Sequence, residues 1–404
     1  MNISVIASSY PRFEGDGTAP FVRSISVALQ KLGNNIEVIA PYDPDVKESE
    51  VQELKVKRFK YALRKKWHIM GHSRSLEGDN NLRFAAYFLI IPYIVMGSIA
   101  LLKSIRRQGS TVVHAHWSLP NGLCAWIVNR IIGTPYIVSL HGSDIFVAKK
   151  NRLFGKINEQ ILRRSKAITA CSKELFDYAE NHGGFGKTNL IAWGADPEIF
   201  APPIDKMACR RKMNLPENAL LITSLGRLVP KKGFDVLVTA FAQVQKPDNT
   251  FLVIGGSGPQ KDFLIEHSQN LGVGNQLILP GAINWNESST FLGASDIFVL
   301  PSIRDPYGNL DGLPTVLLEA MSCGLPCIAS DIGGVSLVVD TWNNGVLVQP
   351  NNMQELHGVL LRLFSDSETR INLGLAARKS VVNKFNWHNV ALRLGELLNE
   401  AILN

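Results

Sequence analysis

The sequence lacks paired cysteines and most of the short signatures of metal, redox or phosphate sites. Its five cysteines are scattered, with no Cys-x-x-Cys pair, so reduced thiols are expected and not a disulfide framework or a zinc site. No Walker A loop, nucleophile elbow or kinase motif occurs. The apolar start, Asn2–Ser8, has no basic segment before it, which predicts a buried strand and not a secretory signal. We expect a cytoplasmic globular protein without a cofactor.

Size and charge suggest two unlike halves. A chain of 404 residues exceeds the size at which one core keeps growing, so two domains are expected. Residues 1–200 carry a net charge of +9 and the remainder −2, which predicts an anionic partner for the first half. The densest basic stretch, Lys55–Trp67, mixes cations with aromatic residues. This mixture suits an anionic membrane surface and not a nucleic acid; a solvated loop and helix face is the alternative.

A long uncharged run, Phe84–Leu102, follows this basic stretch. Its nineteen residues would suffice for a membrane span. Pro92 interrupts it, however, and strand-like segments of one α/β pattern lie on both sides. A span would separate those strands across a bilayer, so we predict a long helix buried against the sheet, with one face available to a membrane.

Short β-branched runs alternate with helical patterns along the whole chain, which is typical of doubly wound parallel sheets. The segment Gly194–Pro203 (GADPEIFAPP) is rich in glycine and proline and predicts a hinge. We expect domains at 1–195 and 196–385, and a final helix at 386–404. Strands are predicted at Ile3–Ser8, Ile36–Ala40, Val112–Ala115, Tyr136–Leu140, Ala167–Ala170, Asn189–Ala192, Leu220–Leu225, Thr250–Ile254, Leu277–Leu279, Ile297–Leu300, Pro326–Ala329 and Gly345–Val348.

The segment Asp311–Glu319 (DGLPTVLLE) separates two acids by seven residues. The first acid lies in a Gly/Pro loop and the second inside an apolar helix. A helix N-terminus offers N–H groups to anions or sugar hydroxyls, and a carboxylate among apolar neighbours is costly unless it is hydrogen-bonded. We expect Asp311 to bind hydroxyls and Glu319 to bind the vicinal hydroxyls of a ribose. A capping acid and an ordinary helix glutamate are the alternative.

A basic loop, Gly226–Gly233 (GRLVPKKG), follows a hydrophobic strand. Arg227 and Lys232 should leave the carboxyl end of that strand, where open α/β sheets bind ligands. A guanidinium and an ammonium suit a diphosphate and can offset leaving-group charge without a metal. We expect Lys231 to face solvent; a solvated basic turn is the alternative for the whole loop.

Polar side chains also end two strands of the first half. In His141–Asp144 (HGSD), His141 is expected to bond a donor-sugar hydroxyl, and Asp144 to orient a hydroxyl or the histidine; a structural histidine is the alternative. His114 and His116 end another strand. We expect one of them to be buried and satisfied, and His116 to lie nearer the acceptor.

The first strand-to-helix loop, Ser8–Pro20, contains Gly15 and Gly17. Pro20 stands where a dinucleotide fingerprint needs its third glycine, so NAD binding is not expected. The two glycines either let an acceptor or phosphate approach the backbone or serve the turn. Asp43–Asp45 (DPD) has the form of a metal-binding acid pair but lies far from the other motifs, and no metal is expected there.

Taken in this order, the motifs resemble the retaining GT-B glycosyltransferases of glycosyltransferase family four (group 1 type). The resemblance covers nearly the whole chain. GRLVPKKG, GGSGP, PGAI and DGLPTVLLEAMSCGLPCIAS form a specific combination, whereas SSYPRFEGDGTAPF, HAHWSLPNG and HGSD resemble members that build bacterial surface polysaccharides. It implies two Rossmann-like domains facing a deep cleft, with the final helix crossing back onto the first domain.

The resemblance also implies residue roles. The chain departs from the family pattern at Asp311, where the family usually has Glu, and at GDG, which replaces the usual glycine pair. The implied roles are donor diphosphate for Arg227 and Lys232; donor sugar and phosphate for Asp311, Gly312, Leu313, Pro314 and Thr315; ribose for Glu319; base for the backbone of Ala282 and Ile283; and the reacting sugar for His141 and Asp144.

The expected activity is therefore transfer of a hexose, with retention and without a metal, from a UDP or GDP sugar. The acceptor would be a glycan or a lipid-pyrophosphate-linked glycan of surface polysaccharide synthesis, reached at the inner face of the cell membrane. A nucleotide-sugar epimerase or hydrolase on the same fold, or a catalytically silent sugar-binding protein, are the alternatives.

Overall fold

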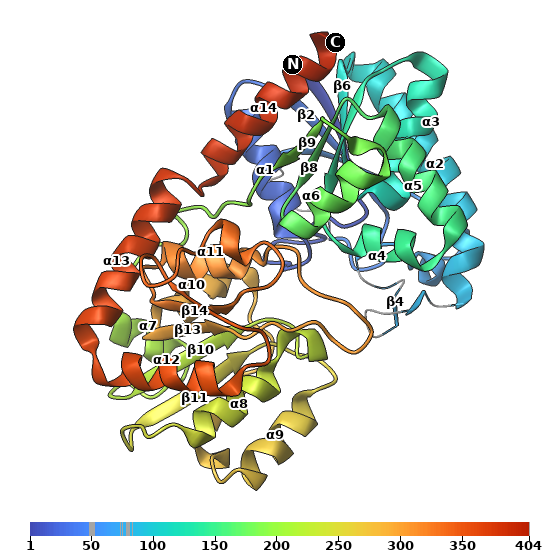
Figure 1. The fold of residues 1–404 in the computed structure, drawn as a ribbon. Helices are drawn as coiled ribbons and strands as arrows, with labels where there is room; N and C mark the ends of the chain where they lie inside the picture. The colour runs from blue at the N-terminus through green and yellow to red at the C-terminus, as the bar shows by residue number, and fades with distance from the viewer. Residues whose placement is uncertain (48–52, 73, 75, 78–80, 83, 404) are drawn as a thin grey trace. The chain divides into compact units, whose positions relative to one another are not determined.

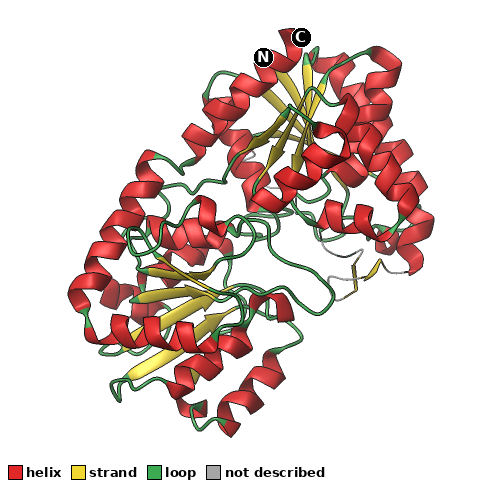
Figure 2. Cartoon of the chain, viewed as in Figure 1, coloured by secondary structure: helices red, strands yellow, loops and turns green. Residues whose placement is uncertain are grey.

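The computed structural model describes residues 1–47, 53–72, 74, 76–77, 81–82 and 84–403. Contacts divide the chain into two compact units, Met1–Ala192 with Trp387–Asn404, and Trp193–Asn386. Each unit is a parallel sheet with helices on both faces (Figures 1 and 2). The doubly wound α/β architecture is thereby confirmed for each unit.

The first unit contains a seven-stranded parallel sheet in the order β3-β2-β1-β6-β7-β8-β9. Its central strands β1, β6 and β7 are buried along almost their whole length, because helices cover both faces. A small antiparallel pair, β4 and β5, lies outside it. The strands are β1 (Asn2–Ile6), β2 (Asn35–Pro41), β3 (Lys55–Phe59), β4 (Leu76–Glu77), β5 (Asn81–Leu82), β6 (Val112–His116), β7 (Tyr136–Leu140), β8 (Ala167–Ala170) and β9 (Thr188–Leu190).

Helices α1 and α14 lie on one face of this sheet, and α2, α3 and α5 on the other (Figure 1). The final helix α14 packs on α1, β6, β7 and β8, so it belongs to the first unit although it comes last in the chain. The helices are α1 (Pro20–Lys31), α2 (Phe84–Gln108), α3 (Leu123–Ile132), α4 (Ser143–Lys150), α5 (Arg152–Arg164), α6 (Lys173–Ala179) and α14 (Trp387–Leu403), with short turns at Lys65–Trp67, Ser118–Gly122 and Glu180–Gly184.

The long uncharged run forms α2, which packs against β1, β2, β3 and α3. Strands β1 and β6, which precede and follow it in the chain, are directly paired. The prediction of a long helix packed on the sheet is confirmed. Among the described helices, α2 is also the one long and apolar enough by composition to cross a membrane.

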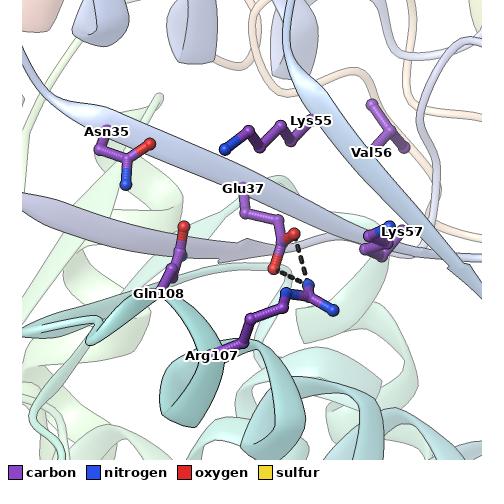
Figure 3. A pocket seen from close by; sticks show the side chains of 7 residues that line it. All are labelled: Asn35, Glu37, Lys55, Val56, Lys57, Arg107 and Gln108. Carbon is purple, nitrogen blue, oxygen red and sulfur yellow. Dashed lines mark hydrogen bonds and ion pairs between the residues drawn. The ribbon is translucent and has the colours of Figure 1, made fainter.

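The basic stretch before α2 contains strand β3, which the sequence analysis did not predict. Lys55 and Lys57 of β3 line an open groove together with Arg107, at the end of α2 (Figure 3). Glu37 of β2 lines the same groove, is largely buried, and accepts hydrogen bonds from Arg107 and Ser104. One acid therefore faces three cations at this edge of the sheet.

The second unit contains a six-stranded parallel sheet in the order β12-β11-β10-β13-β14-β15. The strands are β10 (Leu220–Leu225), β11 (Thr250–Gly255), β12 (Leu277–Ile278), β13 (Ile297–Leu300), β14 (Cys327–Ser330) and β15 (Val346–Val348). The helices are α7 (Lys206–Lys212), α8 (Phe234–Gln243), α9 (Lys261–Asn270), α10 (Trp285–Gly293), α11 (Thr315–Ser322), α12 (Met353–Ser365) and α13 (Ser367–Asn383), with short turns at Pro230–Lys232, Gly274–Gln276 and Val335–Leu337.

The segment predicted as a hinge, Gly194–Pro203, packs within the second unit. Phe200 is buried, and its carbonyl accepts hydrogen bonds from Ser322 at 2.6 Å and Arg378 at 3.0 Å. Ala195 pairs with Asn386 in an isolated bridge. The segment is therefore held by α11 and α13, and the change from one unit to the other falls at Ala192 and Trp193.

Candidate active site

Two glycine turns interlock at the carboxyl ends of β10 and β11. The amide of Gly226 donates to the Gly255 carbonyl at 3.0 Å, and that of Leu228 to the Ser257 carbonyl at 2.9 Å. Gly256 has φ +145°, and a Cβ there would lie 1.8 Å from the Gly226 oxygen. Only glycine fits such a contact, so these residues fix the loop that carries the predicted cations.

That loop places Lys231 and Lys232 around one carboxylate. The ammonium of Lys232 lies 2.6 Å from Asp311 Oδ2, and that of Lys231 lies 3.2 Å from Oδ1. Burial alone would raise the pKa of Asp311, but the two ammonium groups outweigh it and hold this pKa below its ordinary value. The expectation that Lys231 faces solvent is wrong: its side chain is 17% exposed and paired.

Arg227 follows Gly226 in the same loop and is exposed. It lies at the carboxyl end of β10, where the sequence places it. The structure thus brings Lys231, Lys232 and Asp311 together, with Arg227 exposed in the same loop.

The loop Asp311–Pro314 leads into α11. A Cβ on Gly333 would lie 2.3 Å from the carbonyl oxygens of both Asp311 and Gly312, so a third glycine turn holds this loop in place. Leu313 is buried and offers only backbone to a ligand. Helix α11 begins at Thr315 after Pro314 without a side-chain cap. Its first N–H groups therefore suit an anion or a sugar oxygen.

Glu319 lies one turn further along α11 and is 8% exposed. Burial raises its pKa to about 7, partly offset by a hydrogen bond from Thr315. A buried carboxyl group of this kind gains from further hydroxyl donors. The geometry is compatible with the expected ribose contact.

Ala282 and Ile283 follow β12 beside the same glycine turns. The amide of Gly256 donates to the Gly281 carbonyl at 2.7 Å, and a Cβ on Gly255 would lie 2.9 Å from the Ile283 side chain. Ala282 is exposed and Ile283 half-buried. Both therefore lie at the edge that carries Lys232.

In the first unit, His141 and His116 meet at the carboxyl ends of β7 and β6. His116 Nδ1 lies 3.1 Å from His141 Nε2, and the two rings are stacked. Burial lowers the pKa of His141 to about 3 and that of His116 well below its ordinary value. Both rings are therefore neutral at pH 7. Trp117 and Phe21, which the sequence analysis missed, pack against His141 at centroid distances of 4.4 and 5.0 Å.

His116 is fully buried. Its neighbour His114 is buried as well and bonds Ser139 Oγ at 2.8 Å. Only His141 of the three is partly exposed. His116 is thus covered by the protein and contacts His141, the partly exposed one.

Asp144 is buried in the first turn of α4. It accepts hydrogen bonds from the amides of Ser118 at 2.9 Å, Gly142 at 3.0 Å and His141 at 3.4 Å. Burial raises the pKa of Asp144, and these amides partly offset that rise. Asp144 thus orients the backbone that carries His141.

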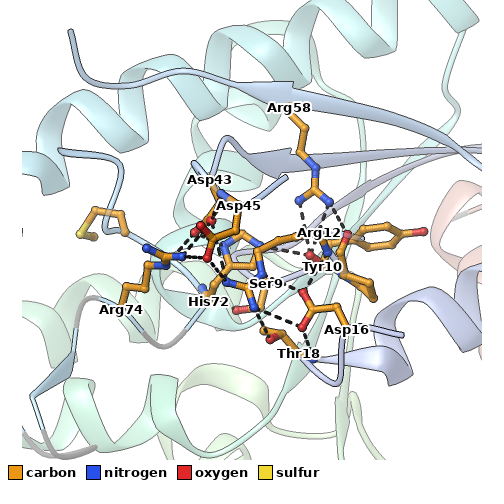
Figure 4. Close-up of polar contacts among 12 residues, drawn as sticks. Ser9, Tyr10, Arg12, Asp16, Thr18, Asp43, Asp45, Arg58, His72 and Arg74 are labelled. Carbon is orange, nitrogen blue, oxygen red and sulfur yellow. Dashed lines mark hydrogen bonds and ion pairs between the residues drawn. The ribbon is translucent and has the colours of Figure 1, made fainter. Parts of the chain in front are cut away.

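The loop of Gly15 and Gly17 is held by a polar network (Figure 4). Arg12 Nε lies 2.7 Å from Asp16, between the two glycines. Gly15 has φ +81°, whereas a Cβ on Gly17 would meet no atom within 4 Å. Gly15 therefore serves the turn, and space for a ligand remains at Gly17.

The acids Asp43 and Asp45 belong to this network and face arginines. Asp43 is buried, 2.9 Å from Arg74 Nε and 3.8 Å from Arg12; Asp45 pairs with the same two arginines. Arg58 donates to the carbonyls of Tyr10 and Pro11. Across the described part of the chain, no cluster of three or more His, Cys, Asp or Glu side chains is placed to hold a metal ion.

Comparison with known proteins identifies the two halves. Residues 205–380 match the model of "Glycosyl transferases group 1" and residues 15–199 that of "Glycosyltransferase Family 4". An Escherichia coli relative, UDP-Gal:alpha-D-GlcNAc-diphosphoundecaprenol alpha-1,3-galactosyltransferase, is 30% identical over 76% of this chain and 79% of its own length. A GDP-mannose-dependent monoacylated alpha-(1-6)-phosphatidylinositol monomannoside mannosyltransferase of Corynebacterium glutamicum is 33% identical over 74% and 79%.

Among solved structures, sucrose-phosphate synthase from Thermosynechococcus elongatus is similar with a TM-score of 0.79 and 21% identity. The match covers 100% of this chain and 99% of that one. The two-domain GT-B fold expected from the sequence is thereby confirmed.

Proposed function

Since the chain belongs to the group 1 glycosyltransferases, we propose that it transfers a hexose from a nucleotide-diphosphate sugar to a glycan or lipid-pyrophosphate-linked acceptor. One observation carries the donor assignment: Lys231 and Lys232 converge on Asp311 directly before the uncapped start of α11. Cations and free N–H groups at one loop edge suit a diphosphate.

In this proposal, Arg227 and Lys232 bind the diphosphate and stabilise the charge that develops as it leaves. Asp311 and the backbone from Gly312 to Thr315 hold the donor sugar and phosphate. Glu319 accepts the ribose hydroxyls. Ala282 and Ile283 meet the base.

The acceptor oxygen bonds to the anomeric carbon on the face where the bond to the diphosphate breaks, and the acceptor proton goes to the departing phosphate oxygen. The anomeric configuration is therefore retained. His141 bonds a hydroxyl of the reacting sugar, oriented by Asp144 through its backbone. The ammonium and guanidinium groups supply the positive charge that a divalent metal would otherwise provide, so we propose metal-independent transfer.

The names of the relatives support the donor and acceptor classes. The E. coli relative is named for UDP-Gal and a diphosphoundecaprenol acceptor, and the C. glutamicum relative for GDP-mannose and a phosphatidylinositol mannoside. We propose a UDP or GDP sugar as donor. We also propose that the enzyme works in the cytoplasm at the inner face of the cell membrane, in surface polysaccharide synthesis.

The test incubates the protein with labelled UDP and GDP sugars, with and without a membrane lipid extract. Label should enter the lipid fraction only when both substrates are present, and NMR of the product should show retention. Product formed from the donor alone would indicate an epimerase or hydrolase. If no donor gives a product, the protein is a catalytically silent sugar-binding protein. Activity should persist in EDTA.

Arg227→Ala should slow turnover at least ~10²-fold, because one preorganised charge at the leaving group is lost. Lys379→Ala, at an exposed position of α13 in the same unit, is the matched control and should leave turnover unchanged. A near-normal rate for Arg227→Ala contradicts the assignment.

A further inference from the structure

Helix α2 exposes an apolar stripe along one side. Phe84, Phe88, Ile91, Val95 and Ile99 are 79%, 69%, 72%, 49% and 40% exposed. Their spacing of three and four residues places them on one face of the helix. A contiguous apolar surface of this kind indicates a partner and is not needed to form the core.

The opposite side of α2 is fixed to the sheet. Tyr93 and Leu101 are fully buried, and Gly97 lies so close to Phe59 and Cys124 that a Cβ there would be 3.3 and 3.1 Å from them. The paired strands β1 and β6 leave the helix no route across a bilayer. The stripe therefore lies along the surface of the first unit.

Cations flank the stripe at its carboxyl-terminal end. Lys103 and Arg106 are exposed one and two turns beyond Ile99. Arg107, in the next position, lines the groove with Lys55 and Lys57 (Figure 3).

A second basic segment of the first unit contacts α2 on its buried side, through Tyr61. The ring of Tyr61 contacts those of Tyr93 on α2 and His68, at centroid distances of 5.2 and 4.6 Å. Just before His68, the turn Lys65–Trp67 carries Trp67, 44% exposed, with the guanidinium of Arg64 over its ring at 5.2 Å. An amphipathic aromatic ring beside cations is typical of a membrane interface.

We propose that this face of the first unit docks on an anionic phospholipid bilayer, with α2 lying in the plane of the interface. The stripe enters the boundary between headgroups and acyl chains, and the cations around it contact lipid phosphates. The proposal deepens the proposed function, since it brings the enzyme to the surface where a lipid-linked acceptor is found. The net charge of +9 over residues 1–200 disfavours a second copy of the chain as the occupant, because two copies of this basic unit would repel each other.

The test is co-sedimentation of the full chain with vesicles of phosphatidylcholine alone or mixed with phosphatidylglycerol. The protein should bind the mixed vesicles at least ~10-fold more strongly, and less strongly as salt rises. The pair Phe88→Gln and Ile91→Gln should lower binding to mixed vesicles at least ~10-fold. Lys103→Gln with Arg106→Gln should lower binding and flatten its salt dependence.

The matched control is Ile371→Gln with Leu375→Gln. These residues of α13 are 62% and 66% exposed but lie in the other unit, so vesicle binding should not change. The second stripe pair, Ile91→Gln with Val95→Gln, replaces the first if the first does not fold, as judged by circular dichroism. Unchanged vesicle binding in a folded stripe variant overturns the proposal. The proposal is also overturned if the wild type forms a dimer but does not bind vesicles, and the stripe variant is a monomer.

Nucleotide binding by the stripe variants separates this proposal from the proposed function. They should bind UDP or GDP as the wild type does, because the stripe and the donor residues lie in different units. If the wild type binds vesicles but transfers no sugar, the proposed transferase function is wrong and the docking surface is supported. If it transfers sugar but binds no vesicles, the docking proposal is wrong and the transferase function is supported.

Discussion

The two units place polar side chains at the same edge of their sheets but stabilise them in opposite ways. In the second unit, Lys231 and Lys232 are charged and paired with Asp311. In the first unit, His116 and His141 are neutral and hydrogen-bonded to each other. The difference teaches that one topology supports two kinds of recognition. Charges suit a diphosphate, whereas neutral rings beside Trp117 suit a sugar face.

The largest expected effect is a difference in stability between two glycine substitutions, one in each unit. Gly256→Ala would place a Cβ 1.8 Å from the Gly226 oxygen at φ +145°, and we expect it to lower the free energy of unfolding by about 3 kcal/mol or more. Gly17→Ala has open space and should change it by less than about 1 kcal/mol. Urea unfolding measures both; equal losses would remove the distinction between a required turn and an open loop.

The next effect concerns catalysis by the two lysines of the second unit. Lys232→Ala should lower kcat/KM at least ~10²-fold, because this ammonium lies at 2.6 Å from Asp311 and is proposed to contact the diphosphate. Lys231→Ala should cost roughly 10-fold or less, since its ammonium is at 3.2 Å. Steady-state kinetics with a labelled donor compares them, and a larger loss for Lys231 would reverse the assignment.

Glu319 should give the second unit a stability that falls as pH rises. Its folded pKa of about 7 exceeds the ordinary 4.5, so between these values the folded state holds a proton that the unfolded state releases. Wild type should lose on the order of 2 kcal/mol from pH 5 to pH 7 relative to Glu319→Gln. Urea unfolding at several pH values tests this, and parallel curves for the two proteins would show that Glu319 is ionised throughout.

His141 should give the smallest effect, with the opposite sign. Its folded pKa of about 3 lies below the ordinary 6.5, so its stabilising contribution is present above pH 6.5 and is lost as pH falls. We expect wild type to lose about 1 kcal/mol from pH 7 to pH 5 relative to His141→Gln, since the ring is partly exposed. If His141→Gln loses as much stability between pH 7 and pH 5 as the wild type does, other groups cause that loss.

Sequence patterns predicted most strands of both sheets and the place of the charged loop after β10, for a physical reason. Strands covered on both faces are continuous apolar runs, and glycines with lysines directly after such a run are typical of a turn that binds an anion. The same logic failed for β3, because Lys55 and Lys57 give an edge strand the composition of a solvated loop. The alternation of exposed Lys55 and Lys57 with the half-buried Val56 was the signal available.

The site of the first unit could be predicted only in part. The position of His141 at a strand end was evident from the chain. The contact with His116, the packing of Phe21 and the arginines around Asp43 depend on residues brought together from separate strands and loops. No spacing along the chain encodes such pairs, so the sequence did not predict that Arg12 and Arg74 would lie beside Asp43 and Asp45.

Helix α14 has a consequence for how the protein is made. Its residues Val390, Leu394 and Leu398 are buried on a unit whose other elements end at residue 192. During synthesis, part of one face of that sheet stays exposed until α14 is made. By then the whole second unit has left the ribosome and can fold. The unit translated first is therefore completed last, and a fragment stopped before α14 should need a chaperone to stay unaggregated.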